Sequence, residues 1–271
     1  MRISFISAIL LFSFVFTSMA QKKTDWEKLN LRGKVKSTNA TEYNMNETEG
    51  EDRTVRHQFV FNNKGYKTQE VLREGFDTKC NSTFKYNADN ELSEEISKLV
   101  HSTSSRKYKY DKKNNTAIEN YYVANGVLIT KTTLKYDDRG NLLERHIENE
   151  KNKEKNKLVE NYWFKYDENN NLIEQKQLIG AVSKTVTFKY DENNRVIEQN
   201  DYDANGLPTY WYTYKYDEKD NVIEEISAYR GYEKTIINYV YVYDSQGNWI
   251  ERREQLGTVT QILSRREIQY F

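Results

Sequence analysis

The sequence predicts an all-β protein in which tandem β-hairpin repeats form a long, twisted, curling antiparallel meander of about 18 strands. A short segment containing Tyr-Asp or a close variant recurs every 24 to 30 residues over most of the 271-residue chain. The residues before each copy alternate between aromatic and polar types, which is the period of a β-strand. Aromatic residues make up 14% of the chain and proline occurs once, whereas disordered chains contain few aromatic residues.

Residues 1–20 are predicted to be a signal peptide that is removed and takes no part in the fold. Arg2 provides the basic start, residues 3–16 are mainly apolar, and Ser18-Met19-Ala20 has the small residues of a cleavage site. The apolar stretch is shorter than the ~20 residues that span a membrane. We therefore expect an exported protein without a transmembrane segment, located in the periplasm, on the cell surface or outside the cell.

The charge balance and the single cysteine narrow the functional classes. Removal of residues 1–20 leaves 40 basic and 41 acidic residues, because Arg2 is the only charged residue among them. This near neutrality argues against a nucleic-acid partner. Cys80 has no second cysteine with which to form a disulfide, and we expect it to be a small buried side chain.

Residues 21–33 are predicted to be an N-terminal lead segment containing a short helix that covers the first edge of the sheet. Asp25 is the expected N-cap of this helix, and Gly33 is expected to end it. The hairpin repeat domain then extends over residues 34–271.

The repeat is clearest when the aromatic residue of each copy is position 0, which places the eight copies at residues 61, 86, 110, 136, 166, 190, 216 and 243. Position +1 is Asp or Asn, whose side chain bonds the backbone two residues later. Position +4 is Gly, Asn or Asp, which tolerate the left-handed conformation. A structural role in these turns is predicted for Tyr136, Asp137, Gly140, Tyr166, Asp167, Tyr190, Asp191, Tyr216, Asp217, Tyr243, Asp244 and Gly247.

The length of the turn decides which side chains share a face of the sheet. Position −1 is usually Lys, position +7 is Leu or Ile in the five clearest copies, and position +8 is Glu. A four-residue loop would place the aromatic residue at −2 opposite +7, with Lys and Glu together on the other face. A three-residue loop would place the aromatic residues opposite Glu unless a β-bulge intervened. We therefore expect four residues.

The pattern aromatic-x-Tyr-Asp-x-x-Gly-Asn-Leu, clearest in residues 134–142 and 241–249, resembles the YD-repeat (Rhs-type) family of exported bacterial proteins. The resemblance extends over roughly residues 57–271. Large members curl such sheets into a shell around a C-terminal toxin, whereas this chain resembles the short, stand-alone exported members. The resemblance also implies a link to carbohydrate binding.

The sequence contains no arrangement typical of catalysis or of metal binding. The segment Asp167-x-Asn169-x-Asn171 begins like a calcium loop but lacks the Gly and the Glu that complete one. No nucleophile elbow, phosphate-binding loop or paired-cysteine motif is present. We therefore expect no cofactor, no metal ion and no enzymatic activity.

An outer-membrane β-barrel is an alternative architecture, because such barrels are also exported and built from antiparallel strands. A barrel of this kind needs an outward apolar band. One predicted face carries Lys and Glu, and the other carries Arg145, Gln175, Glu225 and Arg252 at position +9. This distribution of charge disfavours the alternative.

Three tryptophans are predicted on the Lys/Glu face, and we consider Trp163, Trp211 and Trp249 as candidate ligand-binding residues. Exposed aromatic side chains can form a platform for a glycan or a protein. The alternative is that they pack over neighbouring aliphatic residues.

The function predicted from the sequence is that of an exported, non-enzymatic scaffold that binds a protein or a glycan at the cell envelope. One alternative is an enzyme that acts on polysaccharide. Another is a structural or immunity partner of a secreted toxin.

Overall fold

The computed structural model describes residues 23–45, 54–150 and 159–271, so the predicted signal peptide lies outside the described residues. The described residues form a short helix, one 3-10 turn (Ala124–Gly126) and eighteen strands, as many as the sequence predicts. The helix and strands are α1 (Asp25–Lys28), β1 (Val35–Asn44), β2 (Val55–Phe61), β3 (Lys67–Glu74), β4 (Asp77–Tyr86), β5 (Leu92–Leu99), β6 (Thr103–Asp111), β7 (Thr116–Val123), β8 (Val127–Tyr136), β9 (Leu142–Asn149), β10 (Val159–Tyr166), β11 (Leu172–Ile179), β12 (Val182–Tyr190), β13 (Val196–Tyr202), β14 (Pro208–Tyr216), β15 (Val222–Tyr229), β16 (Thr235–Tyr243), β17 (Trp249–Leu256) and β18 (Val259–Tyr270).

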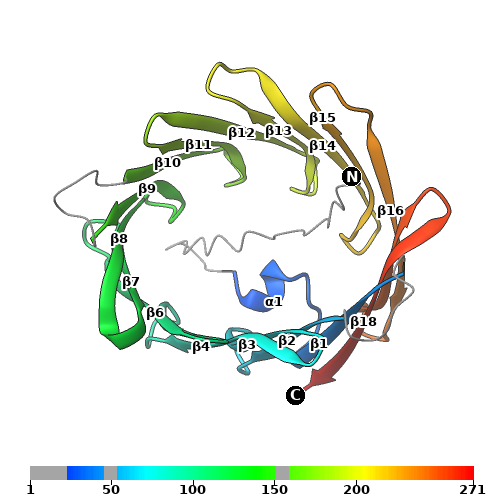
Figure 1. The fold of residues 1–271 in the computed structure, drawn as a ribbon, viewed down its shortest axis with the longest axis horizontal. Coiled ribbons are helices and arrows are strands. Elements are labelled where there is room, and N and C mark those ends of the chain that lie inside the picture. Colours follow the sequence, from blue (N-terminus) through cyan, green and yellow to red (C-terminus); the bar gives the residue numbers. More distant parts are fainter. Residues whose placement is uncertain (1–22, 46–53, 151–158) are drawn as a thin grey trace.

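The strands close into a barrel. Each strand is antiparallel to its neighbours in sequence, and β1 also pairs with β18. Figure 1 shows the resulting ring. The open meander predicted from the sequence is therefore wrong. An open sheet would leave two edges with unpaired backbone N–H and C=O groups, and the pairing of β1 with β18 removes both.

The hairpins at one rim share a turn with a left-handed residue at position +4, as predicted. In the β10–β11 hairpin, the backbone N–H of Asp167 donates to the carbonyl of Asn171 at 2.9 Å, and Asn170 has a φ of 65°. Positive φ occurs at the same position in Gly65, Asn90, Gly140, Asn194, Asp220 and Gly247. The β6–β7 hairpin differs, because its left-handed residue is Asn115 rather than Asn114.

The expected four-residue loop is wrong, because the loop has three residues and is followed by a β-bulge. Tyr166 lies opposite Leu172, whereas Lys165 lies opposite Glu174, so Ile173 is the extra residue. The bulge brings Lys and Glu opposite each other and moves position +6 to the aromatic face. The aliphatic residue at +7 therefore does not face the aromatic residue at −2.

The outer and inner faces of the barrel wall differ in chemistry. The Lys and Glu side chains lie on the outer face and form cross-strand ion pairs with N···O distances of 2.7–3.0 Å. The aromatic residues at −2 and 0 face inward, and residues such as Phe164 and Tyr136 form a small buried cluster with Leu134 and Leu142. The ion pairs are Lys85–Glu94, Lys135–Glu144, Lys165–Glu174, Lys189–Glu198 and Lys215–Glu224.

The lead segment lies inside the ring rather than over a sheet edge, as Figure 1 shows for α1. Thr24, not Asp25, is the N-cap, and it forms a capping box with Glu27. Trp26 packs against Phe61 with ring centroids 6.4 Å apart. The lead segment therefore acts as an inward-folded plug at the rim, since no free edge remains for it to cover.

The two ends of the described chain together complete a ninth hairpin at this rim. Val35 lies opposite Tyr270 and Ser37 opposite Gln269, so Lys36 occupies the bulge position. The backbone N–H of Phe271 donates to the carbonyl of Lys34 at 2.9 Å, as position +1 does to position +5 in the continuous hairpins. Gly33, with a φ of 75°, then corresponds to position +4. The barrel is closed by a hairpin whose two halves come from opposite ends of the chain.

Candidate binding surface on the inner wall

Five of the tyrosines at position 0 connect their hairpin to the preceding one. Their hydroxyl groups donate to the carbonyl at position +6 of the neighbouring hairpin, next to the bulge, at 2.6–3.0 Å. A bulge disrupts the hydrogen-bond ladder locally, and a buried carbonyl needs a donor. The donor and acceptor pairs are Tyr86–Lys67, Tyr110–Leu92, Tyr166–Leu142, Tyr190–Leu172 and Tyr216–Val196.

The aspartates at position +1 are occupied by their own turns. One oxygen of each of Asp167, Asp191, Asp217 and Asp244 accepts backbone N–H groups from positions +3 and +5 at 2.8–2.9 Å. The backbone N–H and the side chain of Arg195 hold the pKa of Asp191 below its usual value. These carboxylates are engaged in turn structure and are poorly placed to bind a ligand.

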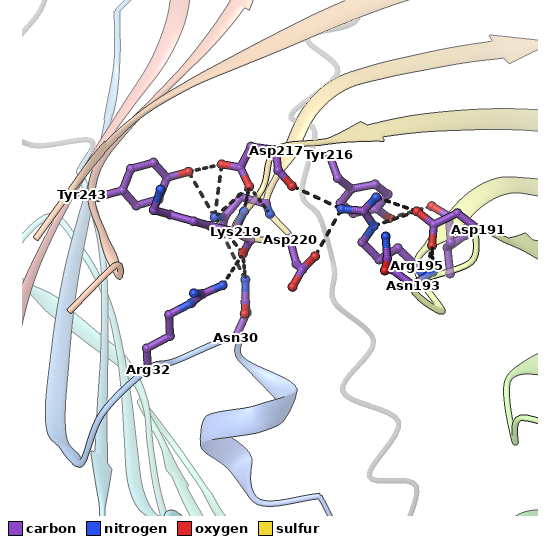
Figure 2. Close-up of polar contacts among 12 residues, drawn as sticks. Asn30, Arg32, Asp191, Asn193, Arg195, Tyr216, Asp217, Lys219, Asp220 and Tyr243 are labelled. Atoms are coloured by element: carbon purple, nitrogen blue, oxygen red, sulfur yellow. Dashed lines mark hydrogen bonds and ion pairs between the residues drawn. The ribbon is translucent and has the colours of Figure 1, made fainter. Parts of the chain in front are cut away.

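Contacts between side chains join successive turns into a continuous rim. Arg195 donates to Asp191 at 2.7 Å within its own turn and to Asp220 of the next turn at 3.2 Å (Figure 2). Asn171 reaches Asn194 at 2.7 Å in the same way. The rim is therefore a ladder of polar contacts around the barrel.

The plug is attached to this rim. Asn30 donates to the carbonyl of Lys219 at 2.8 Å, and Arg32 reaches the same carbonyl at 3.2 Å (Figure 2). Asn248 accepts from the backbone N–H of Arg32 and donates to its carbonyl, both at 2.8 Å. At the other end of the plug, the backbone N–H groups of Asp25 and Trp26 donate to the carbonyl of Gly65.

Away from the rim, the inner wall carries a row of accessible tyrosines on β14, on β15 and in the turn that follows β15. The rings of Tyr210, Tyr212 and Tyr214 are nearly parallel, with centroids 6.2 and 6.5 Å apart. Tyr229 lies across from Tyr210 at 4.7 Å, and Tyr232 extends the row. Tyr210 is 39% exposed and Tyr229 is 42% exposed. We call these five residues the tyrosine row.

Two acidic residues lie beside the tyrosine row on the same face. Asp201 is opposite Tyr210 and forms an ion pair with Lys184 at 2.6 Å. Glu225 is opposite Tyr214, and burial raises its pKa. Burial also raises the pKa of Tyr214, so its hydroxyl stays protonated and can donate a hydrogen bond. The row therefore combines aromatic faces with hydrogen-bond donors and acceptors.

The three candidate tryptophans do not form one platform. Trp163 and Trp211 point outward as predicted, but they lie on β10 and β14, four strands apart. Trp249 is at position +6, opposite Tyr243, and the bulge turns it to the inner face. Its predicted place on the Lys/Glu face is therefore wrong. Trp163 is 42% exposed, and Lys234 lies 5.7 Å from the ring of Trp211.

Three further findings concern side chains that could hold a metal, helices that could cross a membrane, and the single cysteine. In the described ranges, no group of three or more His, Cys, Asp or Glu side chains is arranged to hold a metal ion. No helix among the described residues is both long enough and apolar enough to cross a membrane. Cys80 is a free, partly buried cysteine.

The tyrosine row was missed in the sequence, although a signal was present. Residues 210–214 read Tyr-Trp-Tyr-Thr-Tyr, and strict alternation places the three tyrosines on one face.

The comparisons with known proteins show a fold but no family. No family model matches the chain, and no curated protein matches it. A porin-like protein from Bacteroides uniformis ATCC 8492 is similar in structure, with a TM-score of 0.50 and 12% sequence identity. The match covers 87% of this chain and 98% of that one. At this identity, the similarity concerns the fold alone.

Structures of TcdB2-TccC3 also match, with TM-scores of 0.28–0.30 and 13–14% identity. They cover 76–80% of this chain but only 15–16% of those chains. These matches are too weak to support an argument. The resemblance to YD-repeat proteins therefore stays a prediction.

Proposed function

We propose that this protein is an exported barrel that binds a glycan on its inner wall and does not convert it chemically. The observation that carries the proposal is the tyrosine row, whose rings are partly exposed and lie beside Asp201 and Glu225. An aromatic ring offers an apolar face to the C–H groups of a sugar, and its hydroxyl offers a polar edge. Carboxylates accept hydrogen bonds from hydroxyl groups.

The chemistry of the outer face supports a barrel whose outer surface is in contact with water and not with lipid. Barrels that span a membrane present an apolar band, and Lys or Arg at the bilayer midplane costs about 2–4 kcal/mol each. Here the outer face carries ion pairs such as Lys165–Glu174 and Lys189–Glu198. The likeness to a porin-like protein therefore suggests a shared barrel architecture, and we place this protein in the periplasm or outside the cell.

The state of the acidic residues favours binding over catalysis. Asp201 is held by Lys184 and by Gln199, which donates to it at 2.9 Å. A glycosidase needs two carboxyl groups placed on either side of the bond that is cleaved. Asp201 is also only 5% exposed, so it stabilises the wall of β13, and the exposed tyrosine rings remain as the ligand contacts.

The proposal is tested by binding of the mature chain to a panel of oligosaccharides, followed by calorimetry with the ligands that bind. Replacing Tyr210 and Tyr229 together by Ala should weaken binding by about tenfold or more, because both are accessible aromatic contacts. Trp211→Ala is the matched control, since Trp211 is on the same strand next to Tyr210 but faces outward. It should leave the affinity unchanged.

Other outcomes would overturn the proposal. Equal loss of binding in the Trp211→Ala variant would assign the ligand to the outer face. Release of shorter sugars during incubation would identify the enzyme alternative. Absence of any glycan binding, together with capture of an envelope protein, would favour the protein-scaffold alternative.

A further inference from the structure

Arg266 is an inner-wall arginine whose charge has no carboxylate partner. It lies on β18, its guanidinium carbon is 3.8 Å from the ring centroid of Trp249, and its Nε donates to the carbonyl of Trp249 at 2.9 Å. Among the ion pairs of the described residues, none involves Arg266, and its Nη2 is buried without a hydrogen-bond partner. A buried charge without a partner is costly to the folded state.

The acidic group that acts on Arg266 does not form an ion pair with it. Asp244 is the acidic group that acts on it, but the oxygens of Asp244 are occupied by its own turn and by the hydroxyl of Tyr270. Burial, together with the positive charge of Arg252, lowers the pKa of Arg266 to about 10 against the attraction of Asp244 and Tyr270. The guanidinium remains charged at neutral pH.

Two other arginines on the inner wall are paired, whereas Arg145 lies over the ring of Tyr162 at 5.6 Å and takes part in none of the ion pairs of the described residues. Arg106 lies 3.1 Å from Glu95 and 3.6 Å from Glu119. Arg252, next to Arg266, lies 2.8 Å from Glu254 and 3.3 Å from Glu42. Unlike Arg145, Arg266 also has a buried guanidinium nitrogen without a hydrogen-bond partner.

Stacking on Trp249 prepares Arg266 to bind an anion. An aromatic face fixes the plane of a guanidinium group. Because Nε donates to the carbonyl of Trp249 and Nη2 is buried, Nη1 is the nitrogen left to meet a carboxylate oxygen. Arg266 is only partly buried, so part of its side chain is accessible. Groups whose pKa is strongly shifted by burial cluster at functional sites.

We propose that Arg266, stacked on Trp249, binds an acidic group of the glycan, so that the ligand class is an acidic, uronate-containing oligosaccharide. This inference rests on the proposed function. Arg266 is on β18 and the tyrosine row begins on β14, so the two lie four strands apart on one face, or roughly 19 Å along the wall. An oligosaccharide that contacts both would place its carboxylate at Arg266 and its sugar rings on the tyrosines.

The test compares a uronate-containing oligosaccharide with its methyl ester, which has the same sugar rings but no charge. The wild-type mature chain should bind the acid at least tenfold more tightly than the ester. Arg266→Met should abolish this preference and leave binding of the ester unchanged. The matched control is Arg265→Met, because Arg265 is the adjacent residue, faces outward and pairs with Glu251 at 3.1 Å; it should keep the preference.

The melting temperature separates a binding role from a structural one. Arg266→Met removes an unpaired charge but also the donor to the carbonyl of Trp249, so the melting temperature of the free variant reports the structural role. Only the wild type should gain stability from the acid. Equal affinity of the wild type for the acid and the ester would overturn the inference and leave the proposed function standing. Failure of Arg266→Met to fold would do the same, because it would show that Arg266 has a structural role. No binding of either sugar would overturn both.

Discussion

At the level of single residues, position +4 is decisive in every continuous hairpin of this rim except β6–β7, because its left-handed backbone ends the three-residue loop that precedes the bulge. Gly140 has a φ of 79°, and Asn170 occupies the equivalent position at 65°. Asn adopts this conformation at low cost, whereas a β-branched side chain resists it.

Gly140→Val should therefore lower the free energy of unfolding by about 1–3 kcal/mol, and Gly140→Asn should change it little. The measurement is equilibrium denaturation by urea of both variants beside the wild type. Equal destabilisation by Val and Asn would show that side-chain size, and not backbone conformation, limits this site.

At the level of elements, the plug and the first turn depend on each other. A β-carbon added to Gly65 would lie 2.6 Å from the ring of Trp26, and the φ of Gly65 is 86°. Gly206 is a matched control, because its φ is 75° and an added β-carbon would meet nothing within 4 Å.

Gly206→Ala should cost only the strain of a left-handed alanine, on the order of 1 kcal/mol. Gly65→Ala carries similar strain and must also displace Trp26, so it should destabilise the protein further or release α1. Limited proteolysis of the N-terminal segment, compared between the two variants, measures the release. Identical cleavage rates would mean that the plug does not depend on this contact.

At the level of the whole molecule, the sequence predicts the elements better than their closure. Alternation and the Tyr-Asp turns define the number of strands, the faces of residues such as Lys165 and Phe164, and the left-handed residues. The bulge was not predicted because an aliphatic residue such as Ile173 is compatible both with a regular strand position and with a bulge position. The choice between the two depends on the register that the whole sheet adopts.

Closure of the barrel was missed because its signal is divided between the two ends of the chain. Gly33 and Val35 lack a preceding Tyr-Asp, and Tyr270 lacks a following turn, so neither end by itself matches the repeat. Only their pairing shows a hairpin. The contact between Trp249 and Arg266 on the inner wall could not be predicted either, because these residues lie on β17 and β18 and meet only in the register of the folded sheet.

The pairing of β1 with β18 is tested most directly by a disulfide between them. Asn39 and Glu267 lie opposite each other with outward side chains, and directly opposite residues have β-carbons close enough for a disulfide. In a Cys80→Ser background, Asn39→Cys with Glu267→Cys should oxidise to a single intramolecular disulfide, seen as a mobility shift on a non-reducing gel. It should also raise the melting temperature, because it closes a long loop.

Asn39→Cys with Thr187→Cys, on strands that are not neighbours, should stay reduced. In an open sheet, β1 and β18 would be separated by roughly 80 Å, so an Asn39/Glu267 pair that stays reduced under the same conditions would contradict the closed barrel.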